Sequence, residues 1–348
     1  MTQQKFRVGI TPDWGEQTDA IVGPALREVF DPISDLEYEI MPGSPDLRAR
    51  PEVIDQYDAL LVFGYYFPTE SFEGVSRLKC LARWGVGYDR IDVEACTQAD
   101  VLIALTPTTI RRTVSEGILS LIFALAKNLR RLDLRVREGR WRDNLQCEAI
   151  CVIDRTLGSI GVGNIAGELF RMARGLGFKR LLGYDPYCTP EHAAELGVEL
   201  VDLDTLLAES DFVTINTPLT PETLGLMDRR AFSLMKPTAY FINTSRGQVV
   251  DEEALVEALR ERRIAGAGID VLCEEPPPKD HPLFELDNVI LAPHSVAWTE
   301  EGLKGNSLEA CTNIRSVYRG EAPPFLANPQ AIERPGVQSK LAAWRKAS

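Results

Sequence analysis

Short apolar runs alternate along this chain with longer segments in which apolar residues recur every three or four positions. The first pattern is typical of buried strands, and the second is typical of amphipathic helices that cover a sheet. Strands that alternate with helices favour parallel sheets, because a parallel pair needs a crossover connection. We expect strands at residues 6–10, 36–40, 59–63, 81–84 and 101–105, and then at 158–161, 181–184, 212–216, 239–243, 266–270 and 289–292.

The helical pattern predicts helices at 18–30, 52–57, 112–130, 166–176, 203–209, 229–234, 252–262 and 300–319, and a short docked segment at 341–344. The segment 112–130 is apolar nearly all round, which indicates burial on more than one side. Its charged residues Arg112, Glu116 and Lys127 argue against a membrane span. A helix that connects domains or forms a dimer interface fits this segment better.

These elements predict the α/β class, with two doubly wound parallel-sheet domains and a cleft between them. Residues 1–109 together with 297–348 would form a flavodoxin-like substrate domain. Residues 110–296 would form a Rossmann-type cofactor domain of about six strands, inserted into the first.

The composition excludes some classes of function. Of 348 residues, 45% are hydrophobic and 26% are charged, and the formal net charge of −13 argues against a basic nucleic-acid-binding face. No apolar run reaches the roughly 20 residues of a membrane span, and residues 1–7 lack a signal-peptide apolar region. The seven cysteines form no C-x-x-C pair, and Cys147 and Cys151 have no histidine nearby. We therefore expect no metal site, and reduced, mostly buried thiols in a cytoplasmic protein.

A glycine-rich turn stands between an expected strand and the helix that follows it. Its sequence, Gly161-Val162-Gly163-Asn164-Ile165-Ala166, fits the dinucleotide fingerprint G-x-G-x-x-G/A. Gly161 permits the tight turn, Gly163 lets the backbone approach a pyrophosphate, and Ala166 lets the helix lie close to the strand. Asn164 and Ile165 would offer N–H groups to the phosphates at the helix N-terminus.

Asp185 ends the next expected strand, at a distance of 185 − 163 = 22 positions from Gly163. A carboxylate at this place can accept hydrogen bonds from ribose hydroxyls. No arginine or lysine follows in residues 186–189, so a 2′-phosphate would meet an uncompensated negative charge. The sequence therefore predicts NAD rather than NADP.

Unusual polar residues stand where three later strands are expected to end, in Asn243–Gly247, Asp270–Pro276 and Ala292–His294. In an open parallel sheet, ligands bind outside the carboxyl ends of the strands. Arg246, Glu275 and His294 thus form a set suited to acid–base chemistry on an anion. We expect His192, in a polar helix, and His281, in a proline-rich loop, to be exposed and inert.

Together these motifs resemble the D-isomer-specific 2-hydroxyacid dehydrogenases, the family of phosphoglycerate, glycerate and D-lactate dehydrogenases. The resemblance covers nearly the whole chain. It rests on Arg83-Trp84-Gly85-Val86-Gly87-Tyr88-Asp89-Arg90-Ile91-Asp92, on the glycine turn, on Thr217-Pro218-Leu219-Thr220 and on the order of the three strand ends. It implies an NAD-dependent enzyme that transfers a hydride between nicotinamide and C2 of a D-2-hydroxy acid or 2-keto acid. We also expect a homodimer that forms through the hinge-helix region, and no nucleic-acid or membrane partner.

The resemblance implies a role for each matching residue. His294 would be the general acid/base, Glu275 would hydrogen-bond its other ring nitrogen, and Arg246 would hold the substrate's carboxylate and C2 oxygen. The N–H groups of Val86 and Gly87 would grip the carboxylate from the other domain. The cofactor would contact further residues of the second half, namely Thr217, Pro218, Thr244, Ser245, Asp270 and His294.

The chain departs from the family pattern in three places. Where phosphoglycerate enzymes have a basic residue for the phosphate, this chain has Gly64-Tyr65-Tyr66-Phe67-Pro68, so 3-phosphoglycerate is disfavoured and Tyr65 is a candidate substrate contact. Arg111 and Arg112 would either reach a polar substrate tail or cap the hinge helix from outside, and we favour the second. Trp298 would line the substrate pocket or pack at the domain junction.

Two other functions are considered. One is an NAD(H)-responsive regulatory protein like the C-terminal binding proteins, which also have a tryptophan shortly after the histidine. The other is a dehydrogenase of another small anion, such as phosphite. The intact set of Arg246, Glu275 and His294 argues against the first, but the sequence does not specify the substrate's side chain.

Overall fold

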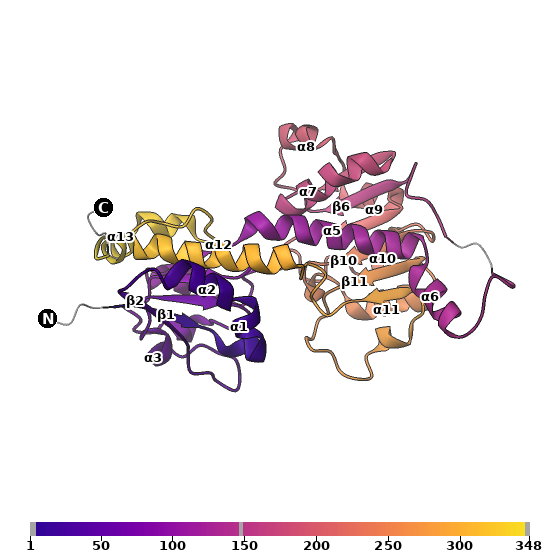
Figure 1. Cartoon of the computed structure of the whole chain (residues 1–348). Helices are drawn as coiled ribbons and strands as arrows, with labels where there is room; N and C mark the ends of the chain where they lie inside the picture. Colours follow the sequence, from indigo (N-terminus) through magenta and orange to yellow (C-terminus); the bar gives the residue numbers. More distant parts are fainter. Residues whose placement is uncertain (1–4, 146–148, 345–348) are drawn as a thin grey trace. The chain divides into compact units, whose positions relative to one another are not determined.

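Two parallel sheets, each covered by helices, organise the chain into two units (Figure 1). The computed structural model describes residues 5–145 and 149–344. One unit comprises residues 1–110 and 299–348, and the other comprises residues 111–298. Helix α5, Pro107–Ala126, contains the first boundary. The apolar segment expected at 112–130 is thus a helix that connects the units, which was one of its two expected roles.

The first unit is a five-stranded parallel sheet with the strand order β2-β1-β3-β4-β5. This is the flavodoxin-like order, and it confirms the predicted fold class. The strands are β1 (Phe6–Ile10), β2 (Leu36–Ile40), β3 (Ala59–Val62), β4 (Cys80–Arg83) and β5 (Leu102–Ala104). The helices are α1 (Thr18–Ile21), α2 (Gly23–Phe30), α3 (Pro51–Ile54), α4 (Val93–Gln98), α12 (Glu300–Tyr318) and α13 (Pro335–Ala342), with 3₁₀ turns at Pro12–Gln17, Thr69–Phe72 and Pro329–Glu333.

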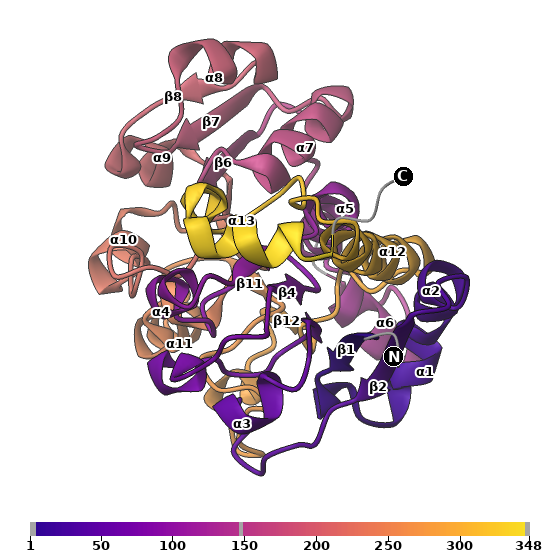
Figure 2. The same ribbon diagram turned by 90° about the vertical axis from the view of Figure 1, so that its left-hand side faces the viewer.

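The C-terminal segment packs back onto the sheet of the first unit. Helix α12 lies against α2, β3 and β4, and both views show it beside α2 (Figure 2). The short docked segment expected near the C-terminus is the end of α13, where Leu341 is buried. The ring centroid of Trp344 lies 5.1 Å from that of Phe6, and the planes are nearly perpendicular. Burial of these rings stabilises the docked segment.

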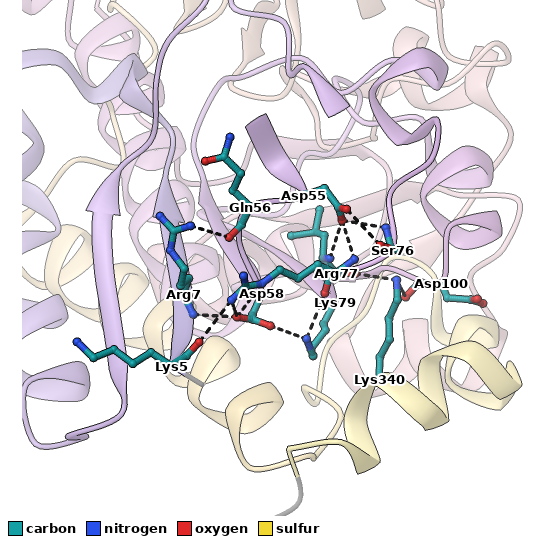
Figure 3. A network of polar contacts seen from close by, with 11 residues as sticks. Lys5, Arg7, Asp55, Gln56, Asp58, Ser76, Arg77, Lys79, Asp100 and Lys340 are labelled. Atoms are coloured by element: carbon teal, nitrogen blue, oxygen red, sulfur yellow. Dashed lines mark hydrogen bonds and ion pairs between the residues drawn. The ribbon is translucent and has the colours of Figure 1, made fainter. Parts of the chain in front are cut away.

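A buried carboxylate joins three strands at the amino edge of this sheet (Figure 3). Asp58, which is 1% exposed, accepts hydrogen bonds from Lys79 Nζ at 2.6 Å, Arg77 Nη2 at 2.6 Å and the Arg7 amide at 2.9 Å. Lys340 of α13 donates to the carbonyls of Leu78, Ala99 and Asp100 nearby. A buried charge costs free energy unless it is paired. The three donors pair the Asp58 carboxylate, and they hold the starts of β1, β3 and β4 together.

The second unit is a seven-stranded parallel sheet with the order β12-β11-β10-β9-β6-β7-β8. This is the Rossmann order with one added strand. The strands are β6 (Thr156–Ile160), β7 (Arg180–Tyr184), β8 (Glu199–Leu200), β9 (Phe212–Ile215), β10 (Tyr240–Asn243), β11 (Gly266–Ile269) and β12 (Val289–Leu291). The helices are α6 (Leu129–Arg137), α7 (Asn164–Ala173), α8 (Pro190–Leu196), α9 (Leu203–Glu209), α10 (Arg229–Leu234) and α11 (Glu252–Arg260), with 3₁₀ turns at Arg174–Leu176, Gly247–Val249 and Pro282–Glu285.

The structure corrects several expected element boundaries. The helix predicted at 18–30 is two helices, because Pro24 at the start of α2 has no N–H to continue the first ladder. The helix predicted at 112–130 ends at Ala126, and Asn128 turns the chain with a left-handed φ of 54°. The edge strand β8 was missed because it has only two residues. Within residues 5–145 and 149–344, no helix is long and apolar enough to cross a bilayer.

Candidate functional site

The glycine turn lies at the carboxyl edge of the seven-stranded sheet, beside the point where the strand order reverses. Strand β6 pairs with β9, and the loops after these two strands contain Gly161 and Asn216. Gly161 has a φ of +91°, and a Cβ on it would lie 2.6 Å from the carbonyl oxygen of Asn216. Only glycine fits a backbone of this shape at this distance from its neighbour. This is the position where doubly wound sheets bind dinucleotides.

Gly163 leaves open space at the start of helix α7. A Cβ built on Gly163 would meet no atom within 4 Å among the described residues. Gly163 is the N-cap of α7, and the small side chain of Ala166 is fully buried against the sheet. The first-turn N–H groups of a helix have no intrahelical acceptors, and they carry the positive end of the helix dipole. The space over Gly163 is therefore suited to an anion.

Asp185 stands beside this turn, as the sequence predicts for a ribose-binding carboxylate. One oxygen accepts a hydrogen bond from the Val162 amide at 2.9 Å, and the other accepts from the Tyr187 amide at 2.8 Å. Each oxygen retains a lone pair for a ribose hydroxyl. Within the described ranges, Asp185 accepts from backbone amides and has no cationic partner. A 2′-phosphate would therefore meet its negative charge. These contacts fit NAD better than NADP.

Two threonine hydroxyls at neighbouring strand ends are buried without a partner. Thr217 Oγ1 follows β9 and Thr244 Oγ1 follows β10, and neither forms a hydrogen bond within the part of the chain that the structure describes. A buried hydroxyl without a partner costs about 1–3 kcal/mol, so a bound molecule that pairs with it gains affinity. Both threonines were predicted from the resemblance as cofactor contacts. Together with the open space at Gly163, these two unpaired hydroxyls form a site that fits NAD.

His294 and Glu275 come together at the same edge of the sheet, from the loops after β12 and β11. His294 Nδ1 lies 2.8 Å from Glu275 Oε2, and the His294 side chain is 46% exposed. Burial raises the pKa of Glu275, but the hydrogen bond and charge of His294 and the Leu272 amide outweigh it, so the pKa lies below its usual value. Glu275 is therefore a carboxylate, and it accepts the Nδ1–H of the ring.

Arg246 follows β10, in a turn that a buried asparagine closes. Asn243 Nδ2 donates to the Arg246 carbonyl at 2.8 Å, and Asn243 Oδ1 accepts from the Ser245 amide at 3.0 Å. A Cβ on the next residue, Gly247, would lie 2.0 Å from the carbonyl carbon of Leu272. The loop of Arg246 thus packs directly on the loop of Glu275. The charge of Arg246 is one cause of the low pKa of Glu275.

Asp270 ties the loop of His294 to the end of β11. The His294 amide donates to the Asp270 carbonyl at 2.7 Å, and the Ser295 amide donates to Asp270 Oδ1 at 2.8 Å. Burial raises the pKa of Asp270, and the Ser295 amide and the His294 charge offset only part of this effect. Asp270 was predicted as a contact of the nicotinamide carboxamide, which stays a prediction. Its role in fixing the His294 loop was missed.

Two further ties between loops were also missed. Gln248 Nε2 donates to the Cys273 carbonyl at 2.8 Å, and the Cys273 amide donates to Glu252 Oε2 at 3.1 Å. These residues join the loops after β10 and β11 without reaching the reacting groups. The sequence does place an amide and a carboxylate side chain after β10, but it does not show which loop each of them contacts.

In the first unit, the loop after β4 presents two backbone N–H groups. Gly85 has a φ of +128°, and its amide donates to Thr106 Oγ1 at 2.7 Å. Within the described residues, neither the Val86 N–H nor the Gly87 N–H has an acceptor. Both are therefore available to a carboxylate, which agrees with the role that the resemblance implies.

Tyr65 does not fit its predicted contact with the substrate. It is 1% exposed and belongs to a buried apolar cluster of the first unit, and its hydroxyl accepts the Ser44 amide at 2.6 Å. No surface is left for a ligand, so this prediction is wrong. The segment 64–68 also has a cation nearby, because Arg90 donates to the Gly64 carbonyl at 2.6 Å and covers the Tyr66 ring.

The remaining candidates have mixed outcomes. Trp298 is 38% exposed in the turn after His294, and its contact with substrate stays a prediction. His192 is exposed, as expected. His281 is 5% exposed and contacts Glu252, so the expectation that it is exposed is wrong: the loop that holds it folds back on α11.

The cysteines are less buried than expected. Six free cysteines are described, of which Cys80, Cys96 and Cys311 are buried and Cys151 is exposed. Cys188 and Cys273 are half-buried. Cys147 lies outside the described residues. The prediction of mostly buried thiols therefore holds for half of those described.

Comparison with known proteins identifies a family for the chain. Residues 119–296 match the model of the D-isomer specific 2-hydroxyacid dehydrogenase, NAD binding domain. The chain is 40% identical over 274 residues to a glyoxylate reductase of Korarchaeum cryptofilum, covering 77% of this chain and 82% of the relative. It is 39% identical over 279 residues to a D-3-phosphoglycerate dehydrogenase of Methanocaldococcus jannaschii, covering 80% of this chain but only 53% of that protein.

A solved structure extends the comparison to the fold. The D-lactate dehydrogenase of Aquifex aeolicus, complexed with NAD and lactic acid, superposes with a TM-score of 0.78 at 28% identity, covering 90% of this chain and 96% of that one. The family model and the well-covered relative each suffice to assign the family. The chain therefore belongs to the D-isomer specific 2-hydroxyacid dehydrogenases, and it is an NAD-dependent oxidoreductase that transfers a hydride between nicotinamide and C2 of a D-2-hydroxy acid or 2-keto acid.

Proposed function

We propose that this dehydrogenase reduces a small, unphosphorylated 2-keto acid of about the size of glyoxylate, with Arg246, Glu275 and His294 as its catalytic residues. The observation that carries the proposal is the contact of 2.8 Å between His294 Nδ1 and Glu275 Oε2, at the edge of the sheet that also bears the glycine turn. The Korarchaeum relative is named a glyoxylate reductase, which supports a substrate of this size.

The proposed chemistry follows from the orientation of the imidazole. Glu275 accepts the Nδ1–H of His294, which leaves Nε2 to face the substrate. Bound NADH supplies the hydride. His294, as the imidazolium, donates its Nε2 proton to the C2 oxygen as the alkoxide develops, and Glu275 stabilises the positive ring before this step. In the oxidative direction, the neutral Nε2 accepts the hydroxyl proton.

The anionic end of the substrate is proposed to meet a guanidinium and backbone N–H groups. The Arg246 guanidinium would hold the carboxylate and the C2 oxygen, because its planar donors suit two oxygens at once. The N–H groups of Val86 and Gly87 would donate hydrogen bonds to the carboxylate as well. Arg90 is a basic residue beside segment 64–68, but its side chain is occupied by the Gly64 carbonyl and the Tyr66 ring. This supports a substrate without phosphate.

We further propose a cytoplasmic homodimer that associates through the region of α5 and α6. Helix α6 has no buried residue, and its side chains Leu129 and Val136 are each 53% exposed. Trp141, shortly after it, is 62% exposed. Apolar side chains gathered on one segment favour a protein partner. A cytoplasmic location is supported by the six free cysteines described.

A panel of keto acids tests the proposed substrate. Glyoxylate, pyruvate, hydroxypyruvate and 3-phosphohydroxypyruvate are compared as acceptors at fixed pH by NADH oxidation, and chiral chromatography identifies the lactate formed from pyruvate. We expect glyoxylate or another unphosphorylated acid to give the highest kcat/KM, and D-lactate as the product. Preference for the phosphorylated acid, or turnover of none of the four, would refute the proposal.

A further inference from the structure

Arg111 and Arg112 are neighbours near the start of α5, but their charge partners differ. Arg112 Nε lies 2.6 Å from Glu116 Oε1, and its Nη1 lies 3.2 Å from Glu168 Oε1. Within residues 5–145 and 149–344, the Arg111 side chain has one polar contact, from Nη1 to Asn164 Oδ1 at 3.5 Å. Among the residues of the described ranges, no carboxylate lies within ion-pair distance of Arg111. Its positive charge is therefore not compensated by its surroundings.

The packing of α5 on α7 decides what each arginine faces. Ser115 is fully buried one turn after Arg111, and its hydroxyl lies 3.0 Å from the carbonyl oxygen of Ile165. This contact fixes the first turn of α7 against α5. Arg111 therefore stands over Asn164, the first residue of α7, while Arg112 reaches Glu168 one turn further along.

The position of Arg111 is electrostatically unfavourable in the unliganded protein. The N-terminus of a helix carries a partial positive charge, so a cation beside it is repelled. An anion at the same place is attracted by both the helix and the arginine. The open space over Gly163 lies at this N-terminus. A dianionic pyrophosphate there would turn an unfavourable arrangement into a favourable one.

We infer that Arg111 is a cofactor-binding residue whose guanidinium pairs with the pyrophosphate of NAD, and that Arg112 forms only a structural ion pair. Planar guanidinium donors match two phosphate oxygens at once. This role replaces both the substrate tail and the outer helix cap that the sequence suggested. The inference rests on the glycine turn as the pyrophosphate site, which belongs to the proposed function.

Ligand binding without turnover tests this role. Affinities for ADP-ribose, which contains the pyrophosphate, and for adenosine, which does not, are measured by displacement of NADH fluorescence. We expect Arg111→Gln to weaken ADP-ribose about tenfold or more, because a charge-assisted hydrogen bond is lost, and to leave adenosine unchanged. Arg112→Gln, the matched control, keeps both affinities. Arg111→Lys keeps the charge and most of the ADP-ribose affinity.

Thermal unfolding gives a second readout. Without ligand, Arg111→Gln is expected to unfold at the same Tm as the wild type or a higher one, because a repelled cation is removed. Saturating ADP-ribose should then raise its Tm by less than that of the wild type. Higher salt should weaken ADP-ribose binding less in the variant, because one charge contact is missing.

Three results would overturn the inference: wild-type ADP-ribose affinity in Arg111→Gln, an equal loss in Arg112→Gln, or an equal loss for adenosine. Gly163→Val separates these from a failure of the proposed site. If Gly163→Val binds ADP-ribose normally, the pyrophosphate lies elsewhere and the proposed site is wrong. If Gly163→Val loses binding while Arg111→Gln does not, only the role of Arg111 is wrong.

Discussion

Two of the histidine–carboxylate pairs in the second unit differ in a way that separates a structural contact from one suited to proton transfer. His281 Nε2 lies 3.0 Å from Glu252 Oε1, and His294 Nδ1 lies 2.8 Å from Glu275 Oε2. The two distances are almost the same. The His281 side chain, however, is 6% exposed, whereas that of His294 is 46% exposed.

The second ring nitrogen shows why exposure matters. His281 Nδ1 accepts the Leu283 amide at 3.3 Å, so Nε2 carries the hydrogen and donates to Glu252. Both nitrogens of His281 are therefore occupied. Within the described residues, His294 Nε2 has no partner. A histidine can transfer a proton to a ligand only when one nitrogen is free at the surface.

The two pairs are also connected through the backbone. The second oxygen of Glu252 accepts the Cys273 amide at 3.1 Å, and Cys273 stands two residues before Glu275. The buried pair thus holds the loop that carries the exposed pair. We propose that the exposed pair carries the chemistry and that the buried pair contributes more to stability, and substitutions should separate the two.

The largest effect is expected from His294→Ala. Loss of the proposed general acid/base should lower kcat by about 10²–10⁴-fold, while NADH affinity stays close to wild type. The free energy of unfolding should fall only by the contribution of the contact with Glu275. Steady-state kinetics, NADH titration and urea unfolding measure the three quantities. Near-wild-type turnover would remove His294 from the chemistry and end the distinction between the pairs.

Arg246→Ala should have the next largest effect. Removing the guanidinium should raise KM and lower kcat, with a loss of roughly 10–100-fold in kcat/KM, because charge-assisted hydrogen bonds to the anion disappear. Arg246→Lys keeps the charge without the planar donors, and we expect it to recover only part of the loss. Unchanged kinetics in both variants would exclude Arg246 from the site.

His281→Ala should affect stability instead of catalysis. It leaves the Leu283 amide and the half-buried Glu252 carboxylate without a partner, which should lower the free energy of unfolding by about 1–3 kcal/mol. The kcat of the folded fraction should change much less than in His294→Ala. His192→Ala is the matched control at an exposed histidine, and urea unfolding compares the two. A large loss of kcat with unchanged stability would contradict the structural assignment.

The pH dependence of stability should reveal Glu275. Its pKa in the folded protein is lowered, so it favours the folded state above its unfolded pKa, and this contribution disappears as pH falls through the folded pKa. The difference in unfolding free energy between wild type and Glu275→Gln should therefore be larger at about pH 7 than at about pH 3. A difference independent of pH would show that the carboxylate charge does not stabilise the fold.

The smallest effect concerns the thiol beside the buried pair. Burial, and then the charge of Glu252, raise the pKa of Cys273 to about 11, so little thiolate forms near neutral pH. Iodoacetamide followed by peptide mass spectrometry should label Cys273 more slowly than the exposed Cys151. Glu252→Gln should speed labelling of Cys273, and an unchanged rate would indicate that its carboxylate has no influence there.

Much of the fold and part of the site are local properties of the sequence. Strand β1 and helices α9 and α10 have the predicted bounds, because periodicity and the flanking polar residues act over a few positions. The glycine turn could be predicted because its positive φ at position 161 is a local property that favours glycine. The strand ends followed from the sheet class, and so the sequence alone pointed to Arg246, Glu275 and His294.

Tertiary structure decided which side chains are buried and which partners they have. Tyr65 was predicted to contact the substrate and His281 to be exposed, yet core packing buries both. Arg111 and Arg112 are adjacent arginines, and only the packing of α5 on α7 gives one of them two carboxylates and the other a helix N-terminus. Such contacts join residues far apart in the chain. Burial and electrostatics depend on these distances in space, which local sequence does not contain.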